Sequence, residues 1–291
     1  MRCLYDGVHP CGKCPACLAN RQRSFMFRLD QEKEFCSFYL WLTLQYDPEH
    51  VPYQDGEMCF SKEHCRGFFE KLRKKYGPEG TTFKHFLVSE YGPNGTKRPH
   101  YHCLLLVYNE KSLADNYLFK QELKQYIFDK AWTYGHVTEK GFHGRVLRYL
   151  TKYCCKPELI GDYHRMKPFT LISKGIGLGY LDILPQKQIE QMKESLNFTV
   201  YYGNSKIQLP RYYVDKILPH SLEDLRKCEN EVQRLELRKT RRALQERNKL
   251  AFEQFHVDYE RDPNSFIQRK ENNRLAKTQE FISKIKSRKD L

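Results

Sequence analysis

Long apolar runs are missing from this chain of 291 residues. No stretch of about eighteen or more apolar residues occurs, so we expect no membrane-spanning helix. The N-terminal residues lack the apolar core of an export signal, which argues against secretion. The glycine-rich segment 169–179 lacks the Gly-Lys-Ser/Thr ending of a Walker phosphate loop, which argues against ATP binding of that type.

Acidic residues are too few to balance the basic ones. Lys and Arg number 50 and Asp and Glu 36, which gives a net charge of +14. This charge predicts a polyanionic partner, of which nucleic acid is the usual one. The charge-dense segment 221–291 is typical either of a solvated helical face or of extra contact with duplex DNA or a partner helix. The glycine-rich segment has two interpretations, a turn against a DNA backbone or an ordinary loop.

The cysteines number eleven, an odd count in a chain without an export signal, so we expect free thiols rather than disulfides. Three of them, Cys11, Cys14 and Cys17, stand at steps of three residues. This spacing suits a Zn²⁺ site in which Cys3 or a distant residue is the fourth ligand. An iron–sulfur cluster is the alternative metal site. Because no fourth ligand is evident, the pattern leaves open whether a metal binds.

Two histidines in one apolar strand are the most informative feature. Alternate strand side chains share a face, so His100 and His102 project the same way from the run 98–107. A Pro-Asn-Gly turn signal joins this run to a second apolar run, 86–92, and the two predict an antiparallel hairpin. Glu90 then lies opposite one of the histidines. Two imidazoles and a carboxylate suit Mg²⁺, Mn²⁺, Fe²⁺ or Zn²⁺, whereas packed or solvated histidines are the alternative.

A helix with two tyrosines follows further along the chain. The run 144–155 places Tyr149 and Tyr153 four residues apart, on one helical face. Lys152 and Lys156 form a second pair with the same spacing. Taken alone, the segment is equally typical of an amphipathic helix whose tyrosines are half in the core.

Taken together, these motifs resemble a known family. The His-hydrophobe-His strand, the upstream glutamate and Tyr-x-x-Lys-Tyr-x-x-Lys look like the HUH endonucleases, and more narrowly like the rolling-circle replication initiators of the microviruses, which have two tyrosines. The apolar run 39–46 sits where such proteins carry their first strand, and the cysteine-rich start looks like that of the gokushovirus branch. The resemblance covers residues 1 to about 185.

The resemblance implies an α+β fold. We expect a ferredoxin-like antiparallel sheet, with the two histidines on a central strand, the tyrosine helix beside it, and a helical basic C-terminal extension. Residues 1–34 are then a Cys-rich segment, 35–185 the nicking and joining core, and 186–291 the extension. From the residues we further expect a helix from 61 to 76 and another from 112 to 131, the second with Leu118, Leu123, Ile127 and Trp132 on its apolar side.

The resemblance also implies an activity, the nicking of one DNA strand at a replication origin by a tyrosine. Tyr149 and Tyr153 are the implied nucleophiles, and Lys152 is assigned to activating them or positioning the phosphate. The implied cofactor is Mg²⁺ or Mn²⁺ on Glu90, His100 and His102. Arg98 and Lys156 are assigned to binding DNA. The expected partners are single-stranded and replicative-form origin DNA and the host's helicase and polymerase, in the cytoplasm of a host bacterium.

Other functions compete with this one. A conjugative relaxase or a single-strand transposase would use the same chemistry, although relaxases often place their tyrosines before the histidines and transposases of this type usually have one. An iron oxygenase with two histidines and a carboxylate fits the ligand set but leaves the net charge unexplained. A non-catalytic DNA-binding or packaging protein would explain the basic tail but not the histidine pair. Covalent capture of DNA separates the nickase from the last two.

Overall fold

The fold is that of a computed structural model, which describes residues 11–12, 14–92, 97–141, 146–152, 166–219, 225, 228 and 230–261. Its elements, in chain order, are α1 (Pro15–Lys33), β1 (Phe38–Gln45), β2 (Tyr53–Gln54), β3 (Glu57–Met58), α2 (Lys62–Tyr76), the 3₁₀ turn η1 (Gly77–Glu79), β4 (Thr82–Tyr91), β5 (Pro99–Tyr108), α3 (Leu113–Tyr126), the π-helical turn η2 (Ile127–Ala131), β6 (Val137–Glu139), α4 (Val146–Lys152), β7 (Thr170–Ile172), α5 (Tyr180–Ile183), α6 (Gln186–Ser195), β8 (Thr199–Tyr202), β9 (Ser205–Gln208), α7 (Arg211–Ile217) and α9 (Glu231–Arg261).

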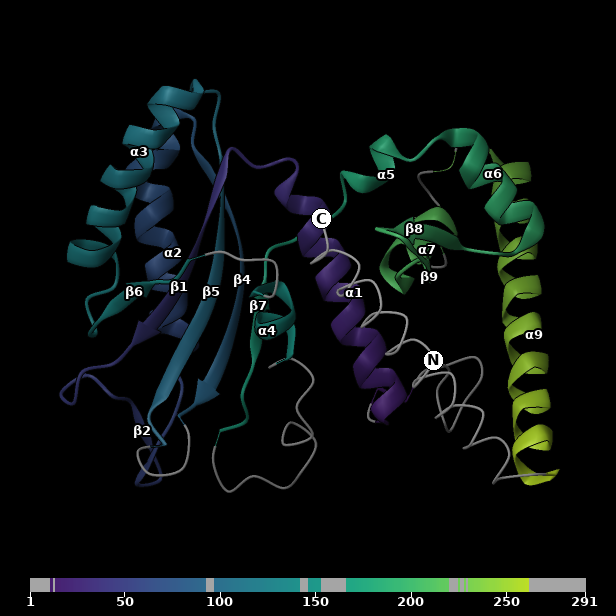
Figure 1. The fold of residues 1–291 in the computed structure, drawn as a ribbon, viewed down its shortest axis with the longest axis horizontal. Coiled ribbons are helices and arrows are strands. Elements are labelled where there is room, and N and C mark those ends of the chain that lie inside the picture. Colours follow the sequence, from purple (N-terminus) through teal and green to yellow (C-terminus); the bar gives the residue numbers. More distant parts are fainter. Residues whose placement is uncertain are drawn as a thin grey trace, which may run out of the picture.

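Five strands form one antiparallel sheet in the order β6-β1-β5-β4-β7. The expected hairpin is β4–β5, and β5, which carries both histidines, is the central strand. Helices α2 and α3 lie on one side of the sheet, and α1 and α4 lie on the other (Figure 1). The predicted α+β class, with an antiparallel sheet and a central histidine strand, is confirmed and is compatible with the HUH endonuclease fold.

The side of the sheet under α2 and α3 holds the larger core. As predicted, α2 begins after Ser61, whose hydroxyl accepts a hydrogen bond from the His64 N–H at 3.1 Å, and it ends at Tyr76. The apolar side of α3 differs from the expectation, because Leu118 is 68% exposed and the neighbouring Phe119 is buried in its place. The prediction for Leu118 was wrong, since the helix is rotated by one residue relative to the expected stripe.

The other side of the sheet carries a second core, shared by α1 and α4. Leu29 of α1 and Leu147 and Leu150 of α4 pack with Phe86 and Leu104 of the hairpin. Helix α1 begins at Pro15, three residues before the expected start, because Cys14 caps it. This core fixes α4, and therefore Tyr149, over β5.

A buried carboxylate connects α1 to the sheet and to the glycine-rich segment. Glu32 is 1% exposed and accepts hydrogen bonds from Lys84 Nζ at 2.5 Å, from the Tyr108 hydroxyl and from the Gly177 N–H. Gly177 has φ +80°, and a Cβ there would lie 2.9 Å from the Cβ of Arg28. These contacts favour the ordinary-loop interpretation of residues 169–179 over the DNA-contacting one.

Residues 180–219 build a third core against α1 and α9. Phe27 of α1 packs there with Tyr213 of α7, and partly buried apolar side chains of α9 pack against the same core. Arg241 of α9 donates to Asp215 of α7 at 2.7 Å. In Figure 1 α9 runs along the edge of this region as a single long helix. The proposed split at Pro263 lies outside the described residues. Among the described helices, none combines the length and apolarity needed to cross a membrane.

Candidate active site

The β4–β5 register brings together the three residues predicted to hold a metal. Glu90 is the cross-strand partner of His100, and His102, two residues further along β5, pairs with Val88. Alternate strand positions share a face, so all three side chains lie on the side of the sheet covered by α1 and α4. The sequence left open which histidine faces Glu90, and the structure gives both.

The distances between their side-chain atoms suit a divalent ion. Glu90 Oε2 lies 3.4 Å from His100 Nε2 and 3.2 Å from His102 Nε2. One ligand atom from each of the three residues lies within 4.8 Å of the others. Donors about 2.1 Å from one ion, at tetrahedral or octahedral angles, lie about 3.0 to 3.4 Å apart. The residues therefore fit the metal that the sequence motifs imply.

The two histidines differ in their surroundings. His102 is 3% exposed, and its Nδ1 lies 3.3 Å from the Thr43 hydroxyl. Burial lowers the pKa of His102 below its ordinary value, against the opposing effect of the Glu90 hydrogen bond, and so favours the neutral imidazole that binds metals. His100 is half-buried, and its Nδ1 is 3.4 Å from the Arg98 carbonyl oxygen.

Tyr149 reaches the histidines from α4. Its ring centroid lies 5.6 Å from that of His102 and 5.8 Å from that of Trp41, edge-on in both cases. Tyr149 is 40% exposed, whereas Leu147 and Leu150 on the other side of the helix are buried. The half-core alternative is therefore partly right, since the ring rests on Trp41 while part of it remains open to solvent.

Of the other predicted site residues, some lie inside the described structure and some outside it. Lys152 is exposed near the end of α4, three residues from Tyr149 and so on the same side of the helix. Tyr153 and Lys156 lie outside the described residues. Cys11, Cys14 and Cys17 are brought together at the start of α1.

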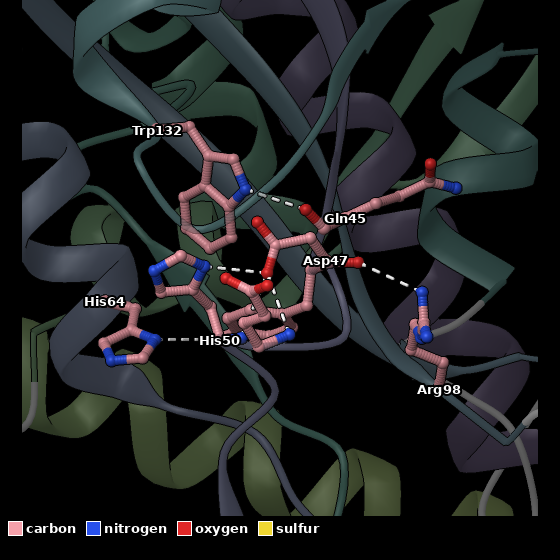
Figure 2. A network of polar contacts seen from close by, with 8 residues as sticks. Gln45, Asp47, His50, His64, Arg98 and Trp132 are labelled. Atoms are coloured by element: carbon pink, nitrogen blue, oxygen red, sulfur yellow. Dashed lines mark hydrogen bonds and ion pairs between the residues drawn. The ribbon is translucent and has the colours of Figure 1, made fainter.

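The end of β1 beside His100 is held by contacts from distant segments (Figure 2). Trp132 Nε1 donates to the Gln45 carbonyl at 2.9 Å, and Arg98 Nη1 donates to the Tyr46 carbonyl at 3.4 Å. Gln45 is the β1 partner of His100. Arg98, assigned to DNA from the sequence, thus also ties β5 to the end of β1.

Two side chains of β1 touch the site and were missed by the sequence reasoning. Thr43 contacts His102 and is its cross-strand partner, and Trp41 supports Tyr149. Both stand at alternate positions of a strand that was predicted, so alternation could have placed them on one face. Assigning that face to the histidines required the β1–β5 register, which joins residues about sixty positions apart.

Comparisons with known proteins agree with this site. Residues 39–158, which include β4, β5 and α4, match a family model described as a replication-associated protein of the ORF2 type. The chain is also 25% identical over 225 residues to the replication-associated protein VP4 of Bdellovibrio phage phiMH2K, an alignment that covers 73% of this chain and 68% of that protein. No solved structure matches the chain.

Proposed function

We propose that this chain, for which the family match and the phage relative support a microvirus-type replication initiator, nicks and rejoins one DNA strand at the viral origin. The observation that carries the proposal is the contact between Tyr149 and His102, whose ring centroids are 5.6 Å apart. It places a phenolic nucleophile beside a Glu-His-His metal group. A DNA-binding protein without catalysis has no need of that pairing.

In the proposed cut, the phenolic oxygen of Tyr149 attacks the phosphorus of one phosphodiester. A bond forms between that oxygen and phosphorus, and the bond from phosphorus to the 3′ oxygen breaks. The phenol loses its proton, and the departing oxygen takes one up. The products are a 5′-phosphotyrosine link and a free 3′-OH that primes rolling-circle synthesis. The link conserves the phosphodiester bond energy, so the step requires no ATP.

Glu90, His100 and His102 would hold Mg²⁺ or Mn²⁺ in this reaction. When bound, the ion supplies charge neutralisation at the non-bridging oxygens and stabilises the departing 3′ oxygen. Burial keeps the His102 imidazole neutral and available as a ligand. Lys152, exposed on the Tyr149 side of α4, would position the phosphate or favour the phenolate.

A second tyrosine would close the circle. Tyr153 is four residues from Tyr149, one helical turn away in the predicted helix. While Tyr149 holds the displaced strand, Tyr153 would cut the regenerated origin. The 3′-OH released by that cut would attack the first phosphotyrosine, which frees a single-stranded circle. In this scheme either tyrosine suffices for one cut, and rejoining requires both.

The test is covalent capture of DNA. The purified chain is incubated with Mn²⁺ and single-stranded DNA spanning the candidate origin, labelled at its 3′ end in one sample and at its 5′ end in another. We expect the 3′ label to move to a protein band that survives SDS, and the 5′ label to appear in a shortened free strand. The reverse distribution would mean a 3′-phosphotyrosine and would contradict the proposed direction of attack.

The variants make the assignment specific. The double variant Tyr149→Phe, Tyr153→Phe should form no adduct, and each single variant should cut but not close circles. Tyr201→Phe is the matched control, since Tyr201 is 75% exposed on β8, outside the sheet that carries the site. Circle closure by the Tyr153→Phe protein would exclude the alternating scheme. An intact DNA substrate, with DNA and Mn²⁺ both bound, would favour the non-catalytic DNA-binding function.

The proposed partners follow from this reaction. Origin DNA, single-stranded or in replicative form, is the substrate, with Arg98 and Lys156 among its contacts. Unwinding and synthesis would come from a host helicase and polymerase in the host cytoplasm. A relaxase or a transposase would form the same adduct, so closure of a unit-length circle on the phage origin is the result that distinguishes the initiator from them.

A further inference from the structure

Three cysteines gather at the first turn of α1, on residues that the proposed nicking reaction does not use. Cys14 is 3% exposed, Cys17 is 6% exposed and Cys11 is half-buried against them. None of the three is in a disulfide. In a protein with free cysteines, metal binding is the usual reason for a group of thiols that is buried and close together.

The spacing of the sulfur atoms suits one tetrahedral ion. Cys11 Sγ lies 3.9 Å from Cys17 Sγ, and all three sulfurs lie within 4.8 Å of one another. Four sulfurs bound to zinc at about 2.3 Å, at the corners of a tetrahedron, lie about 3.8 Å apart. Gly12, with φ +75°, turns the chain between Cys11 and the helix in a conformation that suits glycine. The local backbone therefore gathers the sulfurs at zinc-like distances.

Backbone N–H groups point at two of the sulfurs. The Cys14 N–H donates to Cys11 Sγ at 3.3 Å, and the Cys17 N–H donates to Cys14 Sγ at 3.4 Å. Cys14 thereby occupies the N-cap of α1, where Ser, Thr, Asp or Asn is usual. The first turn of the 19-residue helix carries no acidic residue that would compete for its positive end. A helix start of this kind stabilises thiolates, the form of cysteine that binds metals.

We propose that Cys11, Cys14 and Cys17 bind a structural Zn²⁺ ion that fixes the start of α1. Thiolates are soft donors and select Zn²⁺ over Mg²⁺ or Mn²⁺, so this ion is distinct from the one at Glu90 and the histidines. Its effect extends along α1 to the tyrosine helix. The Gln22 side chain donates to the Arg148 carbonyl of α4 at 3.2 Å, and Leu29 shares a core with Leu147 and Leu150.

The test uses the intact chain without DNA. Zinc is measured by elemental analysis in protein purified in reducing buffer, without chelator or metal-affinity resin. We expect one tightly held zinc per chain in the wild type and in Cys36→Ser, whose half-buried thiol lies at the other end of α1. Cys11→Ser and Cys14→Ser should lose this zinc on dialysis. Zinc retained by both variants would overturn the proposal, as would iron with acid-labile sulfide in place of zinc.

A spectroscopic measurement on wild-type cysteines keeps the test independent of variants that fail to fold. Co²⁺ substituted for the zinc should show a thiolate-to-metal charge-transfer band and the strong visible absorption of tetrahedral cobalt. A His100→Ala, His102→Ala protein should keep both features, because the second metal group contributes no sulfur. Absence of the band in cobalt-loaded wild type would overturn the proposal. Covalent capture of DNA is scored separately, so either proposal can fail alone.

Discussion

Replacing Thr43 by valine should weaken metal binding without removing a metal ligand. Thr43 is 2% exposed, and valine replaces its hydroxyl by a methyl group of similar size. In the metal-free protein, His102 can carry its proton on Nε2, where Glu90 Oε2 accepts it at 3.2 Å. A metal on Nε2 moves that proton to Nδ1, where the Thr43 hydroxyl is the acceptor at 3.3 Å.

The size of the effect follows from this shift of the proton. In the Thr43→Val protein the Nδ1–H of metal-bound His102 is buried without the threonine acceptor. An unsatisfied buried donor costs about 1 to 3 kcal/mol, and most of that cost falls on the metal-bound state, which corresponds to about 5- to 150-fold weaker binding. The metal-free protein avoids most of this cost, so its free energy of unfolding should change less.

Calorimetric titration with Mn²⁺ measures the affinity, and urea unfolding of the metal-free proteins measures stability. Thr43→Ser is the control, because it keeps the hydroxyl and should bind Mn²⁺ nearly as well as the wild type. If Thr43→Val binds Mn²⁺ as tightly as the wild type, or if Thr43→Ser loses as much affinity, the hydrogen bond does not orient His102 and the reasoning is refuted.

Three further predictions concern the scaffold. Burial lowers the pKa of His85, stacked on Phe69, to about 4, below the ordinary 6.5, so its contribution to stability is complete above pH 6.5 and decreases as the pH falls toward 4. The wild type should lose about 2 kcal/mol more than His85→Gln between pH 7.5 and 5 in urea unfolding, and equal losses would contradict this. Gly135→Ala, at φ +148°, would drive a Cβ into the backbone at the end of β1 and should destabilise the chain by about 3 kcal/mol in the same assay, whereas an unchanged midpoint would show that the loop can move aside. Glu32→Gln leaves Lys84 without its anionic partner and should cost about 2 kcal/mol, mainly at low salt, and insensitivity to salt would mean that packing alone is responsible.

The hairpin and its metal group were predictable from sequence because all of their determinants are local. The two apolar runs, the turn between them and the alternation of His100 and His102 lie within about twenty residues, and the short turn restricts the register of Glu90. The order of strands in the sheet was implied only by the family resemblance. Strand patterns do not say which strand lies in the centre.

The parts that were missed depend on long-range packing. Trp41 and Thr43 join the site through pairing between β1 and β5, which local patterns do not encode. Leu118 and Phe119 are adjacent and similar in hydrophobicity, and only the surface under α3 decides which is buried. Cys14 caps α1 in place of a more usual residue, so the helix began earlier than its composition suggested. In each case local chemistry was ambiguous and tertiary contacts decided the outcome.

Helix α1 holds the two halves of the molecule together like a beam between two walls. Phe27 and Leu29, two residues apart and on opposite sides of the helix, belong to different cores. A chain shortened at residue 185 would still contain every residue assigned to the nicking reaction, yet one flank of α1 would lie bare to water. Attempts to isolate a minimal nickase should therefore replace Phe27 with a polar residue, or keep residues 186–219, to avoid an aggregating fragment.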